Sequence, residues 1–82
     1  MAIAQAAEIV DPVRLGRELR VRGKDWMDLS RGPHRLNPTT IGRLRHRRPV
    51  STRTLRTLAL WLRSTPVLSE LEAILAPAEG AA

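Results

Sequence analysis

The stretch of sequence that decides the fold reads Asn37-Pro38-Thr39-Thr40-Ile41-Gly42-Arg43-Leu44-Arg45-His46-Arg47-Arg48. Its first two residues mark a helix start, because Asn accepts from free backbone N–H groups as an N-cap and Pro loses nothing at the first helical position. Ile41 and Leu44 lie three residues apart and so share one face. We therefore predict a helix over Pro38–Arg47, anchored by these two apolar side chains.

The remaining positions of this helix predict a small, polar and basic outer face. At about 100° per residue, four residues point away from the apolar pair, namely Thr39, Gly42, Arg43 and His46. Thr40 and Arg47 flank this face on one side and Arg45 on the other. The stem of Arg48 is expected to extend the buried stripe, and Pro49 to stop the helix.

Charge is distributed unevenly along the chain. The net charge is +6, yet residues 1–30 are balanced, residues 31–63 contain nine Arg and no Asp or Glu, and residues 64–82 are acidic. A basic centre of this kind indicates a nucleic-acid surface. The alternative is a solvated, Arg-rich surface from a genome biased toward Arg and Ala codons.

Composition restricts the class of protein. Eighty-two residues form one small domain with a modest core. Tyr, Phe and Cys are absent and only two Trp occur, which disfavours aromatic-rich β folds and excludes disulfides and thiolate metal sites. No apolar run approaches the roughly 20 residues that span a bilayer, and no signal peptide is recognisable. We expect a soluble, cytoplasmic, mainly helical protein without a membrane partner.

Catalysis is not predicted. No acidic residue occurs from position 29 to position 69, so His34 and His46 have no nearby sequence partner to orient them. His34 lies in an expected loop, and without Cys a metal site with His46 is improbable. Gly-rich phosphate loops are also absent. We expect no enzyme activity, no cofactor and no metal.

Four further helices are predicted around the central one. The first covers 11–22, starts at Asp11-Pro12, ends at Gly23, and buries Leu15 and Leu19 with Val13 nearby. The second covers 24–31, with Asp25 as N-cap and Trp26 and Leu29 in the core, and ends at Gly32-Pro33. The fourth covers 52–64 after the N-cap Ser51.

The fourth and fifth helices show apolar stripes. The fourth buries Leu55, Leu58, Ala59 and Leu62, with Trp61 at the edge of the stripe and Leu60 outside it. The fifth follows Pro66 and carries Leu68, Leu71, Ile74 and Leu75. Residues 1–10 are expected to be flexible or weakly helical, 11–76 to form the domain and 77–82 to form a tail. No segment alternates clearly enough to predict a strand.

Five short helices in this order resemble the Cro/cI-type, or XRE-type, helix-turn-helix regulators of bacteria and phages. The resemblance runs from Leu15 to about Leu75. The matching positions are Leu29-Ser30, Thr39-Thr40-Ile41, Leu44, and Leu55 with Leu58. One departure is that the segment from Ser30 to Ile41 is one residue longer than usual, with Gly32-Pro33-His34-Arg35 in place of the family's Gly turn. A shorter second helix and an altered angle into the next helix are therefore expected.

The resemblance implies an all-α, five-helix, lambda-repressor-like domain that binds double-stranded DNA with helix Pro38–Arg47 in the major groove. The residues expected to read bases are Thr39, Thr40, Gly42, Arg43 and His46. Those expected to contact phosphates are Lys24, Asn37, Arg45, Arg47, Arg48, Ser51, Thr52 and Arg53. Arg43 is the strongest single candidate, because its fork matches guanine O6 and N7.

A homodimer is the family's usual arrangement, and the candidate dimer residues are Leu60, Leu68, Leu71 and Leu75. The most favoured role is a transcriptional repressor of the Cro or immunity-repressor type, in a bacterial cytoplasm. The alternatives are an antitoxin-type regulator with a protein partner, a protein-interaction adaptor that no longer reads DNA, and a non-specific RNA or single-strand binder. Trp26 and Trp61 could serve the last of these by stacking on bases, but both fall on apolar stripes and are expected in the core.

Overall fold

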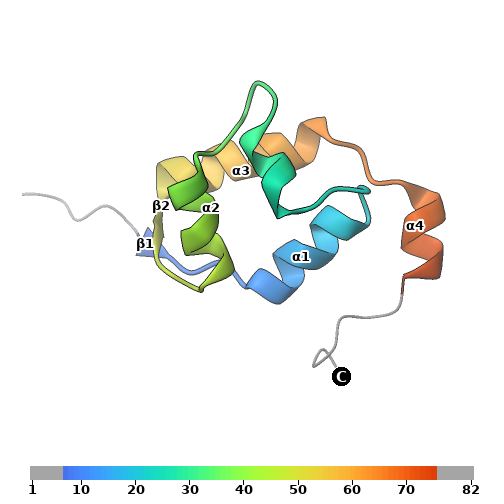
Figure 1. The fold of residues 1–82 in the computed structure, drawn as a ribbon, viewed down its shortest axis with the longest axis horizontal. Helices are drawn as coiled ribbons and strands as arrows, with labels where there is room; N and C mark the ends of the chain where they lie inside the picture. The colour runs from blue at the N-terminus through green and yellow to red at the C-terminus, as the bar shows by residue number, and fades with distance from the viewer. Residues whose placement is uncertain (1–6, 76–82) are drawn as a thin grey trace, which may run out of the picture.

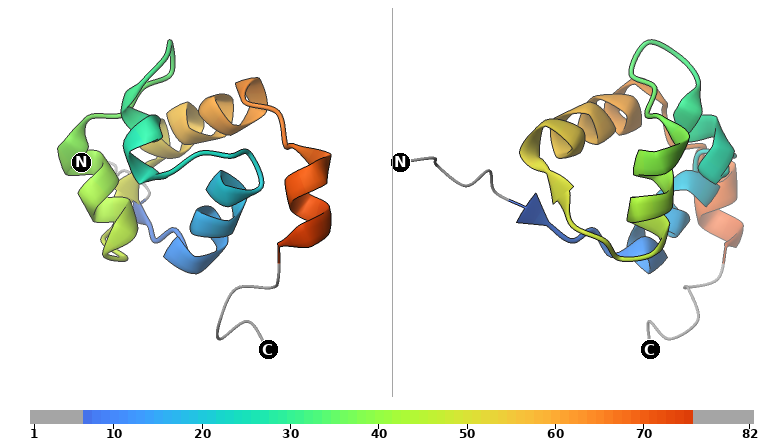
Figure 2. Two further views of the ribbon diagram at one scale, coloured as in Figure 1. Left: turned by 45° about the vertical axis from the view of Figure 1, so that its right-hand side comes forward. Right: turned by 60° about the vertical axis from the view of Figure 1, so that its left-hand side comes forward.

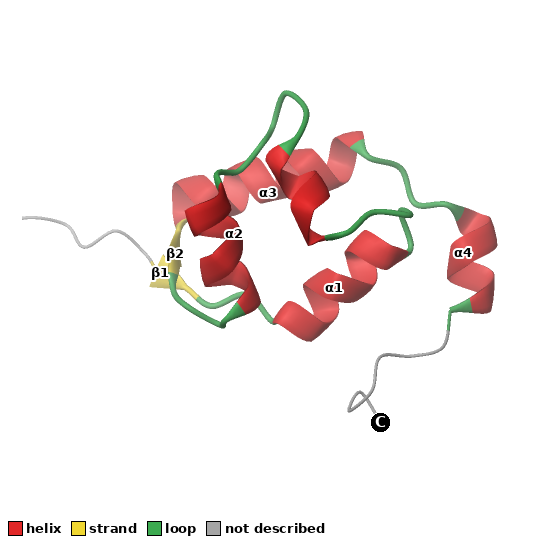
Figure 3. Cartoon of the chain, in the orientation of Figure 1, coloured by secondary structure: helices red, strands yellow, loops and turns green. Residues whose placement is uncertain are grey.

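The order of elements along the chain is a short strand, two helical segments, the central helix, a second short strand and two more helices. The structure is a computed structural model that describes residues 7–75. The elements are β1 (Ala7–Glu8), α1 (Pro12–Arg20), the 3-10 helix η1 (Trp26–Ser30), α2 (Pro38–Arg45), β2 (Val50–Ser51), α3 (Thr52–Ser64) and α4 (Ser69–Ile74). The domain is thus mostly helical with a small two-stranded sheet (Figures 1 and 3).

Polar side chains begin three of the helices, as predicted. The Asp11 carboxylate accepts from the Val13 N–H at 2.9 Å, and the Asn37 amide oxygen accepts from the Thr40 N–H at 2.8 Å. The Ser51 hydroxyl accepts from the Thr54 N–H at 3.2 Å. Each bond satisfies a backbone donor that has no partner within its own helix. The predicted starts of α1, α2 and α3 are therefore confirmed.

The second predicted helix, 24–31, is a five-residue 3-10 helix instead of an α-helix. Asp25 and Asp28 cap each other: the Asp28 N–H donates to the Asp25 carboxylate at 3.1 Å, and the Asp25 N–H donates to the Asp28 carboxylate at 2.9 Å. This capping box closes a single turn. The chain then leaves through an extended Arg31 and through Gly32, whose φ of 88° favours glycine. The expectation of a short second helix is met.

The core lies between α1, η1, α2 and α3. Its three most buried side chains are Leu19, Leu29 and Leu44. Around them lie the other members of the cluster, Leu15, Leu36, Ile41, Val50, Leu58 and Trp61. Leu36 is held in the loop before α2 by its backbone N–H, which donates to the Leu29 carbonyl at 2.8 Å. Burial of these apolar side chains stabilises the fold and presents α2 with one face inward.

Four expectations about burial were wrong in detail. Val13 is 46% exposed because two residues at about 100° each turn its side chain away from that of Leu15. In α3, Ala59 is exposed, whereas Leu60 is half-buried. Trp61 is buried, as expected, and with Leu58 it marks the centre of the inward face of α3. Arg48 is exposed and does not extend the buried stripe of α2.

The sheet was not predicted. Ala7–Glu8 pairs antiparallel with Val50–Ser51, so the segment expected to be flexible or weakly helical is extended at these two residues. β1 is exposed on both residues, while Val50 in β2 is 5% exposed and reaches the core. Strands of two residues are too short to show an alternating sequence pattern, so only the contact between these distant segments defines them.

α4 lies at one end of the molecule beside the C-terminal end of α1, away from α2 and the sheet (Figures 1 and 2). The Leu68 N–H donates to the Val21 carbonyl at 2.8 Å. Side-chain carbons of Leu68 and Leu71 lie over Gly23, where an added Cβ would be 3.3 and 3.5 Å away. α4 therefore docks on the turn that ends α1.

Two sets of residues lie outside the described range. They are residues 1–6, in the predicted flexible segment, and 76–82, which contain the predicted tail. Within residues 7–75, no helix is both long enough and apolar enough to cross a membrane.

Candidate nucleic-acid interface

The two faces of α2 are as predicted. Ile41 and Leu44 are 4% and 0% exposed and join the core. On the outer face, Thr39, Arg43 and His46 are exposed, while Thr40 and Gly42 are half-buried. The helix therefore offers solvent a face that combines hydroxyl, guanidinium and imidazole groups, all of which can donate hydrogen bonds.

Gly42 leaves open space on that outer face. An added Cβ at Gly42 would meet no atom of the protein within 4 Å. Close packing against a neighbouring element therefore does not explain this glycine. Within a helix a glycine costs up to about 1 kcal/mol relative to alanine. The open space allows a partner to approach the α2 backbone closely.

The C-terminal end of α2 differs from the prediction. The helix ends at Arg45, with His46 as its cap residue, instead of continuing to Arg47. Arg47 adopts a left-handed φ of 56°, and the Arg48 N–H donates back to the Arg43 carbonyl at 2.8 Å. This backbone bond and the left-handed residue form the Schellman type of helix ending. Arg47 and Arg48 thus lie on the exposed turn that leads into β2.

Arg45 is positioned by a contact that no sequence pattern predicted. Its guanidinium carbon lies 5.6 Å from the centroid of the Trp26 ring, within the range of a cation–π interaction. Trp26 is half-buried against the core, and Trp61 is 5% exposed with its indole N–H donated to the Arg31 carbonyl. Both Trp rings therefore pack within the fold, as predicted. No local pattern links positions 26 and 45, so only the folded chain brings them together.

The start of α3 follows the end of α2 closely. Residues 46–51 connect the two helices, and β2 runs directly into Thr52. Thr52 and Arg53 are exposed, and the Ser51 hydroxyl caps the helix by accepting from Thr54. The N-terminus of a 13-residue helix carries partial positive charge. The turn after α2 and the start of α3 together form a continuous basic segment.

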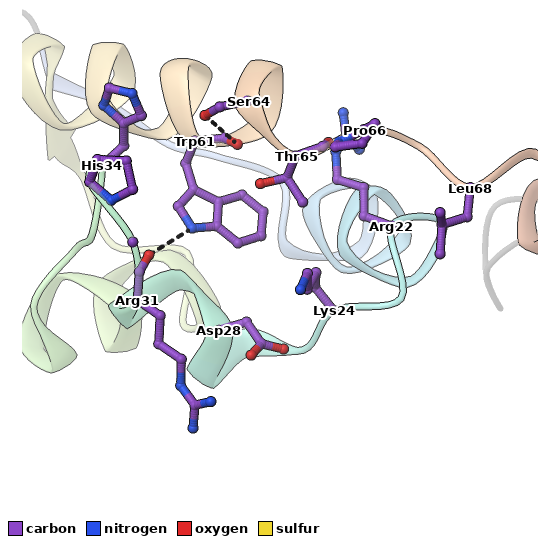
Figure 4. Close-up of a pocket in the computed structure, with 12 residues that line it drawn as sticks. Arg22, Lys24, Asp28, Arg31, His34, Trp61, Ser64, Thr65, Pro66 and Leu68 are labelled. Atoms are coloured by element: carbon purple, nitrogen blue, oxygen red, sulfur yellow. Dashed lines mark hydrogen bonds between the residues drawn. The ribbon is translucent and has the colours of Figure 1, made fainter.

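Two other predicted phosphate contacts, Lys24 and Asn37, lie outside that basic segment. Asn37 is exposed but its amide oxygen already caps α2. Lys24 is exposed in the turn before η1 and lines a pocket beside Trp61 and Thr65, to which no residue of α2 contributes (Figure 4). The structure therefore does not bring Lys24 to the outer face of α2.

Every arginine of the acid-free stretch is exposed. These are Arg31, Arg35, Arg43, Arg45, Arg47, Arg48, Arg53, Arg56 and Arg63. None of them forms an ion pair with a carboxylate of the described residues, in contrast to Arg22, which pairs with Glu18 at 2.8 Å. Unneutralised cations on a surface attract polyanions and release counterions on binding.

The predicted dimer residues are only partly available. Leu60, Leu71 and Leu75 are half-buried, and Leu68 is 43% exposed. Leu68 and Leu71 already cover Gly23 within the same chain. The most exposed large apolar side chain in residues 7–75 is Ile74, at 76%, which belongs to the same helix.

This chain matches no protein-family model, no curated protein and no solved structure.

Proposed function

We propose that this protein is a sequence-specific, double-stranded DNA-binding transcriptional regulator, with α2 as the helix that enters the major groove. The observation that carries the proposal is the outer face of α2. It combines exposed Thr39, Arg43 and His46 with the open space at Gly42, in a stretch that contains no acidic residue. A helix inserted into the major groove needs hydrogen-bonding side chains, close approach and no carboxylate near the phosphates.

The proposed division of roles follows position. Arg43 reads a base, and Thr39, Thr40 and His46 contact base edges or nearby backbone atoms. The exposed turn of Arg47 and Arg48, with Arg53 and the N-terminus of α3, contacts phosphates and sets the register without reading sequence. Arg45 reaches phosphate from its position over Trp26. The order α1, η1, α2 supports a lambda-repressor-like helix-turn-helix arrangement, with the 3-10 helix in the place of the second helix.

We further propose a homodimer that acts as a repressor of the Cro or immunity-repressor type in a bacterial cytoplasm. A two-fold dimer places two copies of α2 about one turn of DNA apart, so its site is roughly palindromic. The exposed Ile74 of α4 and Leu68, the residue before this helix, are the apolar surface that such a dimer would cover.

The decisive experiment is selection of bound sequences from a pool of random duplexes, followed by a salt titration on the best site. We expect an enriched, roughly palindromic motif and a strong loss of affinity with rising salt. A pool that shows no enrichment would rule out sequence-specific regulation. Analytical ultracentrifugation with and without the selected duplex measures the dimer.

A second candidate function uses the same domain as an antitoxin-type regulator or as a protein-interaction adaptor. The exposed apolar side chains of Leu68, just before α4, and of Ile74, at its end, are the feature that favours a protein partner. An antitoxin would bind both its operator and its toxin. An adaptor would retain its partner after Arg43→Ala, and its DNA affinity would be weak and equal for all sequences.

A further inference from the structure

A pocket of about 650 Å³ lies on a part of the molecule that the proposed DNA interface does not use. Its wall is built from the turn after α1, from η1 and the loop that follows it, from the C-terminal end of α3 and from the connection to α4 (Figure 4). Pockets of this size hold small organic ligands in many proteins. The residues around it decide the chemical class of ligand.

Cations predominate at the pocket. Arg22, Lys24 and Arg31 line it, with Asp28 as the one acidic residue among its lining residues. Arg22 is committed to the fold, because its Nε donates to the Thr65 carbonyl at 2.8 Å and its Nη1 to the Glu18 carboxylate at 2.8 Å. Lys24 and Arg31 are exposed and have no carboxylate of the described residues within ion-pair distance.

Asp28 does not cancel these cations. One of its oxygens accepts the Asp25 N–H at 2.9 Å, which ties the carboxylate to the capping box. In Figure 4 the Asp28 side chain lies between those of Lys24 and Arg31. Two cations against one carboxylate that is already hydrogen-bonded leave a net positive site, which favours an anion.

Part of the pocket wall is apolar. The Trp61 indole lies on one side and is 5% exposed; its N–H donates to the Arg31 carbonyl at 3.3 Å, so the small part of the ring that reaches the pocket is carbon. Pro66 and Leu68 line the side toward α4. A ligand that fills this space gains by covering apolar surface as well as by meeting the cations.

We propose that this pocket is a binding site for a small organic anion with an apolar body. The body lies against Trp61 and Pro66, and the carboxylate, sulfonate or phosphate of the ligand meets Lys24 and Arg31. The proposal is independent of the proposed function, because it requires no DNA.

The test is a titration of 15N-labelled protein with 8-anilinonaphthalene-1-sulfonate at fixed salt and without DNA, followed by two-dimensional NMR. We expect saturable shifts at the Trp61 indole N–H and at the backbone of Gly32. The double variant Lys24→Gln/Arg31→Gln should weaken binding by about tenfold, because two charge-assisted contacts are lost. Lys24→Arg should retain binding. Thermal melts of each variant verify that it is folded.

The matched control is Arg14→Gln/Arg56→Gln, which removes the same charge from exposed positions outside the pocket. It should leave the affinity for the sulfonate unchanged within about twofold. The neutral analogue N-phenyl-1-naphthylamine should bind more weakly than the sulfonate. Equal loss of affinity in the control, or equal binding of the neutral analogue, would overturn the proposal.

A final arm distinguishes a small anion from a DNA phosphate. A random-sequence duplex is titrated in place of the sulfonate. We expect it to shift residues of α2 and to leave the Trp61 indole N–H in place. If the duplex shifts that N–H and displaces the sulfonate, the pocket belongs to a DNA backbone contact and the proposal fails.

Discussion

The guanidinium of Arg45 lies over the ring of Trp26, with 5.6 Å between its central carbon and the ring centroid. This contact joins the last turn of α2, the helix that the proposed function places in the major groove, to the first residue of η1. It holds a long, exposed side chain in one direction and thereby reduces the conformational entropy that Arg45 would lose on meeting a phosphate.

Removal of this contact should lower stability measurably. Arg45→Ala is expected to reduce the free energy of unfolding by about 0.5–1 kcal/mol, the range for an exposed cation–π pair. Chemical denaturation measures the change. The effect should disappear in a Trp26→Leu background, and Arg43→Ala, on the same helix without a ring beneath it, should change stability less. A loss that persists without Trp26 would show that the ring contact is not its cause.

Arg43 and Arg48 should affect DNA binding in different ways. Arg43→Ala is expected to relax preference at one base pair and to cost about 1–3 kcal/mol on the best site. Arg48→Ala should weaken all sequences alike and reduce the salt slope by about one. Binding curves on the best site and on single-base variants at several salt concentrations separate the two. Identical behaviour of both variants would contradict the assignment of Arg43 to base reading.

Gly42→Ala should raise stability and lower DNA affinity. An added methyl group meets no protein atom within 4 Å, so the helix gains about 0.5–1 kcal/mol from the better propensity of alanine. On the same face, the methyl group would separate α2 from the groove. Thermal melts and duplex titrations of one protein preparation measure both. Unchanged affinity in a stabilised variant would mean that the partner does not approach Gly42.

Arg47 combines an unfavourable backbone conformation with a cation. Because its φ is 56°, Arg47→Gly should stabilise the fold by about 1 kcal/mol, whereas Arg47→Ala should not. Both variants remove one charge and should weaken DNA binding by the same factor on every sequence. The pair thus separates backbone strain from charge. A drop in stability of Arg47→Gly would show that the side chain makes a stabilising contact.

The free energy of unfolding should fall in acid as Asp28 becomes protonated. The backbone N–H of Asp25 donates to the Asp28 carboxylate and holds the pKa of Asp28 below its usual value. Burial of the carboxylate opposes this shift. Hydrogen bonding with the Asp25 side chain and the charges of Lys24 and Arg31 lower the pKa further. A pKa lowered by folding adds stability that is complete above the ordinary Asp value of about 3.9 and is lost as pH falls below it. Denaturation midpoints between pH 7 and pH 3 should therefore fall.

The variant Asp28→Asn should show less of this acid-side loss and a lower midpoint at pH 7. Asp28→Glu places the usual capping-box residue at the same position. It should keep the wild-type midpoint at pH 7 and the wild-type loss of stability in acid. If wild type and Asp28→Asn fall in parallel with pH, other carboxylates account for the acid sensitivity.

The parts of the fold that were predictable depend on local chemistry. Asp11, Asn37 and Ser51 begin helices because each side chain bonds to a backbone donor a few residues away. The three-residue spacing of Ile41 and Leu44 likewise identified the buried face of α2, and with it the exposed face that forms most of the candidate site.

The parts that were missed depend on contacts between distant segments or on an unusual backbone. β1 pairs with β2 across more than 40 residues, which is the distance in sequence from Glu8 to Val50. Arg47 takes a left-handed conformation that glycine would normally signal, so the end of α2 was placed too late. The stacking of Arg45 on Trp26 and the pocket beside Trp61 arise only once η1, α2 and α3 are packed together.

The docking of α4 has a consequence for how the domain opens. α4 is six residues long and contains no buried residue. It is held by the backbone bond from Leu68 to Val21 and by two leucines over Gly23, and none of its residues belongs to the core cluster. Segments with few buried contacts exchange their amide protons through local opening, at a lower free energy than global unfolding. We therefore expect α4 to open separately from the rest of the domain, and its detachment would uncover the buried Val21 while α2 keeps its position on the core.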